Sequence, residues 1–186
     1  MKLNLLTLSL VFLTTANVWA ADDAQLLQQL KQARFSLVDA INNAEKTSGP
    51  AISAKFEMDG NDLVFSVYTA PQGLMVSAEE TELMELSGSA VSLPVTAKTE
   101  IFTDKEHIAR ASTHLTLMEL STLTLKQVIE LAQSYQSGIV FSVKNPLVRN
   151  HRAVADVSIL KVDGKVAVVS IDLLSSHCYF IGSKTN

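Results

Sequence analysis

The sequence is poor in cysteine, glycine and charge. Its single cysteine, Cys178, excludes a disulfide within the chain, so the fold must be stabilised by burial alone. The seven glycines include neither a P-loop nor a Rossmann spacing, which excludes a phosphate-binding glycine loop of these types. Charged residues make up 18% of the chain, too few to indicate a disordered protein. A folded core is expected, with Cys178 as a small buried side chain, a metal ligand or half of an intermolecular disulfide.

Basic residues are outnumbered by acidic ones. The chain has 15 Lys and Arg against 19 Asp and Glu, which gives a formal net charge of −4. Removal of an N-terminal segment that contains Lys2 and no acid would make this 14 − 19 = −5. Nucleic-acid binding requires a basic face that neutralises phosphates. The charge balance therefore argues against a general nucleic-acid-binding protein.

The first twenty residues have the pattern of a cleavable export signal. Lys2 supplies the positive start, residues 3–13 are mostly Leu, Val and Phe, and Val18-Trp19-Ala20 fits the positions that signal peptidase reads. The apolar run is far shorter than the roughly 20 residues that cross a bilayer, and no later stretch is apolar enough to do so. We expect cleavage after Ala20, a mature chain of 186 − 20 = 166 residues, and a periplasmic or secreted protein.

The first half after the signal, residues 21–87, begins with a helical pattern. Apolar residues recur at three- and four-residue steps over 21–46, and Ser36 with Asp39 can form a cap that divides this helix in two. Alternating apolar and polar residues then predict strands, and Asp59-Gly60-Asn61-Asp62 supplies a hairpin turn. Three strands are predicted here, over 52–58, 63–69 and 74–78. Residues 79–86 fit either a helix or a strand.

Residues 88–121 have the composition of a connection, with a bridging helix that Thr103 and Glu106 could cap. The second half, 122–186, repeats the order of the first. Thr124 and Gln127 form a cap for a helix that stops near Gly138, and a hairpin turn follows at Asp163-Gly164. The strands of this half are predicted over 139–144, 153–161 and 165–174.

The two halves also match residue by residue. The first helix has Leu37, Ile41 and Ala44 at the spacing of Leu125, Ile129 and Ala132 in the second. Amphipathic spacing alone can produce such a match, but a duplicated unit explains the shared element order as well. The sequence thus predicts an α+β fold of two helix-plus-three-strand antiparallel units, 21–87 and 122–186, joined by a helical bridge over 88–121.

Several segments together resemble the PepSY domain, a helix-on-sheet family with a cystatin-like fold. In the first half these are 37–41 (LVDAI), 44–46 (AEK), 49–57 (GPAISAKFE) and 64–68 (VFSVY); in the second they are 125–143, 153–159, 163–165 and 171–173. The resemblance implies a cell-envelope module that binds or restrains peptidases, or senses envelope components. The acidic-aromatic ending common in that family is replaced here by Ser66-Val67-Tyr68, so a contact made there in relatives does not transfer.

Candidate catalytic and metal-binding groups do not converge in the sequence. His107 and His114 lie two helical turns, about 10 Å, apart, too far to hold one metal from a single helix. His177 and Cys178 are neighbours, and on a strand they would point to opposite faces. No Gly-x-Ser-x-Gly elbow is present. We therefore predict a protein that is not an enzyme, with no cofactor and no metal.

A basic loop is the candidate partner-binding site. Lys144, Arg149, His151 and Arg152 fall in a stretch without an acid from residue 141 to 154, and arginine suits carboxylate or phosphate groups. The alternative is a solvated hairpin loop. In either case, replacement of the two arginines by serine is expected to leave stability nearly unchanged.

The sequence predicts an exported envelope protein that binds another macromolecule by strand addition at a sheet edge. Restraint or regulation of a peptidase is the version that the family resemblance implies. The alternative is a periplasmic carrier for a small ligand or a metal, with a cavity between helices and sheets. The oligomeric state stays open.

Overall fold

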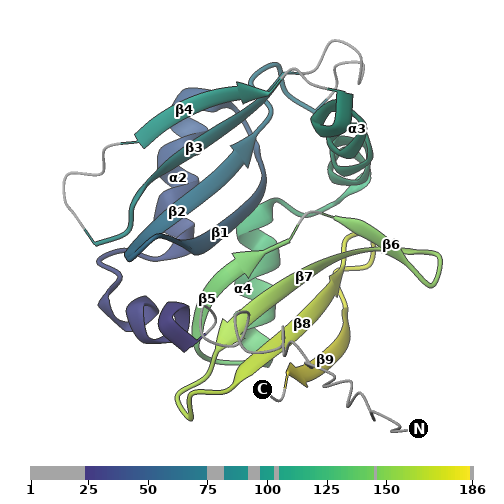
Figure 1. Cartoon of the computed structure of the whole chain (residues 1–186). Coiled ribbons are helices and arrows are strands. Elements are labelled where there is room, and N and C mark those ends of the chain that lie inside the picture. The colour runs from purple at the N-terminus through teal and green to yellow at the C-terminus, as the bar shows by residue number, and fades with distance from the viewer. Residues whose placement is uncertain (1–23, 75–81, 92–96, 103–104, 145, 185–186) are drawn as a thin grey trace, which may run out of the picture.

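The computed structural model describes residues 24–184 apart from 75–81, 92–96, 103–104 and 145, and its strands form one continuous antiparallel sheet (Figure 1). The strands are β1 (Ala51–Asp59), β2 (Asp62–Thr69), β3 (Leu83–Ser89), β4 (Ala97–Phe102), β5 (Ile139–Val143), β6 (Leu147–Arg149), β7 (Arg152–Leu160), β8 (Val166–Asp172) and β9 (Cys178–Lys184). Their order across the sheet is β4-β3-β2-β1-β5-β7-β8-β9, and β6 pairs with β7 beside this path. The sheet therefore ends in β4 on one side and β9 on the other.

Two of the described helices cover one face of the sheet, and a third packs against β1, β3 and β6. The helical elements are η1 (Leu30–Gln32), α2 (Leu37–Ser48), α3 (Lys105–Leu120) and α4 (Leu125–Tyr135), preceded by helical residues 24–29. In Figure 1, α2 and α4 lie behind the strands, α2 against β1 and β2 and α4 against β5, β7 and β8. Helix α3 contacts β1, β3 and β6. No helix of the described residues is long and apolar enough to cross a membrane.

The predicted helix starts at Ser36 and Thr124 are confirmed. The Asp39 amide donates to Ser36 Oγ at 3.2 Å and the Ser36 amide donates to Asp39 Oδ2 at 2.8 Å, which together form a capping box at α2. Thr124 and Gln127 form the same box at α4, with distances of 3.3 and 2.8 Å. The helix predicted between the halves is confirmed as α3, whereas its predicted cap residue Thr103 lies outside the described residues.

One hydrophobic core extends through both halves of the chain. The buried faces of α2 and α4 pack on the inward side chains of the central strands, and Phe65 is fully buried among them. The main helix contributions to this core are Leu37, Ala40, Ile41, Ala44, Leu125, Val128, Ile129 and Ala132. A second, smaller core joins α3 to β1 and β3; it consists of Ile52, Ala70, Leu83, Leu115 and Met118.

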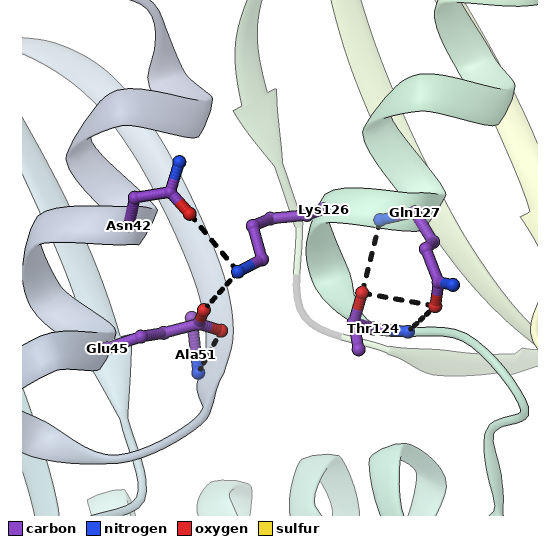
Figure 2. Close-up of polar contacts among 6 residues, drawn as sticks. All are labelled: Asn42, Glu45, Ala51, Thr124, Lys126 and Gln127. Carbon is purple, nitrogen blue, oxygen red and sulfur yellow. Dashed lines mark hydrogen bonds and ion pairs between the residues drawn. The ribbon is translucent and has the colours of Figure 1, made fainter.

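The predicted fold of two units joined by a helical bridge is wrong. Strands β1 and β5 pair directly, with Ala54 opposite Val143 and Lys55 opposite Ser142, so the halves share one sheet. Helices α2 and α4 also contact each other above the β1–β5 pair, and this boundary between the two halves is called the seam below (Figure 2). A strand edge left open in the middle of the protein would bury unpaired backbone groups, and pairing β1 with β5 satisfies them.

Figure 2 shows the polar contact that joins the two helices at the seam. Lys126 Nζ on α4 lies 2.7 Å from Glu45 Oε2 and donates to Asn42 Oδ1 at 3.1 Å, both on α2. Glu45 Oε1 also accepts the Ala51 amide at 3.2 Å, at the start of β1. The Glu45 carboxylate on α2 therefore contacts both β1 and α4.

The strand predictions are partly confirmed. Hairpins form at both predicted turns, because β1 pairs with β2 through Asp59 opposite Asp62, and β7 pairs with β8 across Asp163-Gly164. The strand predicted over 74–78 falls mainly outside the described residues, and β3 begins only at Leu83. Strands β4, β6 and β9 were not predicted, and β4 lies within the stretch assigned to the connection.

Candidate functional site

Arg149, His151 and Arg152 of the predicted basic loop lie in a tight hairpin formed by β6 and β7, whereas Lys144 lies before β6. Arg149 pairs with Arg152, and the two residues between them, Asn150 and His151, have φ angles of 50° and 63°. Positive φ at both central residues is the signature of a type I′ turn, whose twist matches that of the flanking strands. The turn therefore places the two arginines opposite each other, directly beside the turn.

Arg149 is held by a buried carboxylate on the neighbouring strand. Its Nη2 lies 2.7 Å from Asp156 Oδ2, and its Nη1 donates to Asp156 Oδ1 at 3.2 Å and to Ser170 Oγ at 3.0 Å. The Ser170 hydroxyl in turn donates to Asp156 Oδ1 at 2.5 Å. The Asp156 side chain is 12% exposed, so the guanidinium neutralises a charge that has little contact with water.

Arg152, which lies beside β9, contacts its carboxylate through one nitrogen instead of two. Its Nη1 donates to Asp172 Oδ2 at 3.1 Å, and its guanidinium carbon lies 5.0 Å from the centre of the Tyr179 ring, within range of a cation–π interaction. The Tyr179 hydroxyl accepts a hydrogen bond from Asn150 at 3.3 Å. The Arg152 side chain is 51% exposed. Among the described residues, its Nη2 and Nε have no acceptor.

Asp172 does not depend on Arg152 alone. Its Oδ1 accepts the amides of Leu174 at 3.0 Å and Ser175 at 2.9 Å. Burial favours the neutral acid, but these amides and the Arg152 guanidinium outweigh burial and hold the pKa of Asp172 below its ordinary value. The carboxylate is therefore ionised and largely satisfied by the loop that follows β8.

The four predicted site residues differ in whether they are paired with an acidic residue. Arg149 and Arg152 are paired with carboxylates, whereas Lys144 and His151 are exposed and form no ion pair within the described part of the chain. No direct signal in the sequence indicated that Asp156 and Asp172, which follow the acid-free stretch, would contact its arginines. An indirect sign was present, because polar residues alternate along β7 and β8 at Asp156 and Ser158 and at Ser170 and Asp172. A partner-binding role for the loop stays a prediction.

The histidines and the cysteine whose side chains the structure describes are not gathered into a metal site. No group of three or more His, Cys, Asp or Glu that could hold a metal occurs among the described residues. Cys178 is half-buried and packs against the main core, while His177 Nδ1 lies 2.8 Å from the Ser175 carbonyl oxygen. The side chain of His107 is outside the described part.

A second polar region crosses the first half of the sheet. Ser66 donates to Glu85, Lys55 pairs with Glu57, and burial together with Glu85 raises the pKa of Tyr68 to about 12. Strand register extends this region into the second half, since Lys55 is opposite both Ser66 and Ser142. Ser142 is in turn opposite Ser158. Within the described residues Ser53 and Ser158 are 7% and 8% exposed and have no hydrogen-bond partner for their hydroxyls.

The two outer strands differ in composition. No described strand pairs with the outer edge of β4 or of β9. Strand β4 contains the charged residues Lys98 and Glu100, whereas β9 is uncharged from Cys178 to Ser183. Charges on an outer strand discourage the addition of a further strand, and an uncharged edge permits it.

Comparison with known proteins identifies no family for this chain. No protein-family model and no curated protein matches it. Among solved structures it is similar to a candidate lipoprotein of Clostridium difficile 630, at 19% identity, with 82% of this chain and 95% of that chain covered and a TM-score of 0.43. A TM-score under 0.5 does not establish a shared fold, and the PepSY resemblance stays a prediction.

Proposed function

We propose that this chain is an exported, non-enzymatic protein of the cell envelope that binds an extended segment of another protein along an outer strand. The observation that carries the proposal is the sheet itself, which ends in β4 and β9 with no described strand beyond either. Backbone amides and carbonyls at such an edge can pair with a partner segment, and side chains on alternate positions then supply selectivity.

Two further observations support a binding role over catalysis. Buried charges such as Asp156 and Asp172 are engaged by arginines or backbone amides, and the hydroxyl that Asp156 contacts, that of Ser170, is fully buried. The export pattern of residues 1–20 supports the envelope location. Restraint of an envelope peptidase is the form of this function that the PepSY resemblance suggests.

Position-specific photo-crosslinking in cells tests the proposal. A photoreactive residue at Tyr179 in β9 or at Thr99 in β4 should capture a protein partner. The matched control is Val162, a 99% exposed valine in the turn between β7 and β8, which belongs to neither outer strand. Capture at an edge position but not at residue 162 supports strand addition. Equal capture at all three positions, or at none, contradicts it. A captured peptidase should lose activity when the purified mature chain is added.

A small-ligand carrier is the second candidate, and the buried hydroxyls of Ser53 and Ser158 favour it. A buried hydroxyl without a partner is costly, and a bound polar molecule would satisfy it. A melting screen with small polar metabolites tests this function, since a ligand at 100 times its Kd stabilises the fold by about 2.7 kcal/mol. Stabilisation that Ser158→Ala abolishes would favour the carrier.

A further inference from the structure

The two arginines of the hairpin differ in what they can still bind. Both terminal nitrogens of Arg149 are engaged by Asp156, and one of them also by Ser170. Arg152 uses only Nη1, and its carboxylate partner Asp172 is already satisfied by two backbone amides. A guanidinium has five N–H donors. Within the described residues, Arg152 therefore keeps the N–H donors of Nη2 and Nε free to bind a further acceptor.

Arg152 also lies close to the open edge of the sheet. Arg152 is the first residue of β7, yet its guanidinium lies over the ring of Tyr179 on β9. Strand β9 is two strands away from β7 and is the last strand on that side of the sheet. A strand added to β9 would lie about 4.8 Å beyond it. An acidic side chain on that added strand could reach across to Tyr179, because diagonal and direct cross-strand neighbours lie within reach of long side chains.

We infer that β9 is the edge that receives the partner, and that the partner segment carries an acidic residue whose carboxylate binds Arg152 beside Tyr179. This inference rests on the proposed function and adds to it the edge and the chemistry of the ligand. The guanidinium supplies a charge-assisted, forked donor pair, and the aromatic ring holds it in place. The uncharged stretch from Cys178 to Ser183 leaves the rest of the edge open to backbone pairing, which β4 with Lys98 and Glu100 does not.

Random heptapeptides displayed on phage and selected on the purified mature chain provide the probe. Synthetic copies of the selected peptides are then titrated into wild type, Arg152→Gln and Arg152→Lys, with Lys165→Gln as the matched control. Lys165 is an exposed lysine in the turn between β7 and β8, so its replacement removes the same charge elsewhere on the surface. Thermal melting of each variant shows whether the fold is retained.

The inference expects selected peptides to be enriched in Asp or Glu, and their binding to weaken at least about tenfold in Arg152→Gln. Arg152→Lys should recover part of the affinity, and Lys165→Gln should change it less than twofold. In amide NMR spectra, the peptide should shift the signals of 178–184 and leave those of 97–102 in place.

Other outcomes overturn the inference in distinguishable ways. Peptides that bind without an acidic preference, that tolerate Arg152→Gln or that shift the β4 amides leave strand addition standing and refute the assignment to β9 and Arg152. A mature chain that elutes as a dimer with protected β9 amides shows that a second copy occupies the edge, which also refutes it. Selection of no peptide counts against the proposed function as well.

Discussion

Removal of the Arg149 guanidinium should destabilise the fold, in contrast to the expectation from the sequence. In Arg149→Ala, the Asp156 carboxylate keeps the Ser170 hydroxyl but loses both contacts to its cation. Breaking a fully buried ion pair costs about 3–5 kcal/mol. The Arg149 side chain is 38% exposed, so water can replace part of its contribution. We therefore expect a loss of about 2 kcal/mol, within the range for hydrogen bonds to charged groups.

Urea unfolding of the purified mature chain at neutral pH measures this loss. The midpoint should fall while the m-value stays constant, because the surface exposed on unfolding is unchanged. In thermal unfolding the same loss corresponds to about 4–8 °C for a chain of this size. Lys144→Ala serves as the control, since it removes an exposed charge of the same loop and should change stability by less than about 0.5 kcal/mol.

A double-mutant cycle with Asp156→Ala identifies the cause. Because Arg149 and Asp156 are in contact, the double variant should be more stable than the sum of the two single losses predicts, by at least about 1 kcal/mol. The reasoning is refuted if the free energy of unfolding of Arg149→Ala lies within about 0.5 kcal/mol of the wild-type value, the same limit as for the Lys144→Ala control. Strictly additive losses would also refute it, because they would show that the two side chains stabilise the fold independently.

Three further predictions concern the seam, a turn and an ion pair. Lys126→Ala should cost about 1 kcal/mol in urea unfolding, because Glu45 is only 22% exposed; an unchanged midpoint would show that the seam does not need the contact. Gly49→Ala should destabilise more than Gly60→Ala: φ is positive at both, but only at residue 49 would a Cβ meet a carbonyl oxygen, at 2.4 Å. The lowered pKa of Asp172 contributes stability that is present above its ordinary pKa near 3.8 and is lost as pH falls through the lower folded value. Asp172→Asn should therefore flatten the dependence of unfolding free energy on pH below about pH 4, and parallel curves for the two proteins would contradict this.

Local features of the fold could be predicted from the sequence because neighbouring residues determine them. The capping boxes at Ser36 and Thr124 need only a hydroxyl and a side-chain acceptor three residues apart. The turn at Asp163-Gly164 requires a residue that accepts positive φ, and Gly164 has a φ of 80°. Each of these signals lies within four or five consecutive residues, so the sequence alone is sufficient to identify it.

Long-range pairing could not be predicted in the same way. The alternation in 52–58 and in 139–144 indicates two strands with a buried face, yet it carries no information on whether β1 and β5 are neighbours. The same limit applies to the candidate site. Counting charges along 141–154 predicted a basic surface, whereas the strand register brings Asp156 and Asp172 to the arginines and cancels most of that charge.

The shared core has a consequence for how this chain can be divided. If the polypeptide were split between α3 and α4, each fragment would expose the apolar surface that now packs across β1 and β5. Such fragments would aggregate when produced alone and would reassemble when produced together. Neither half could thus be transplanted into another protein as an autonomous module, even though their helices and hairpins follow the same order.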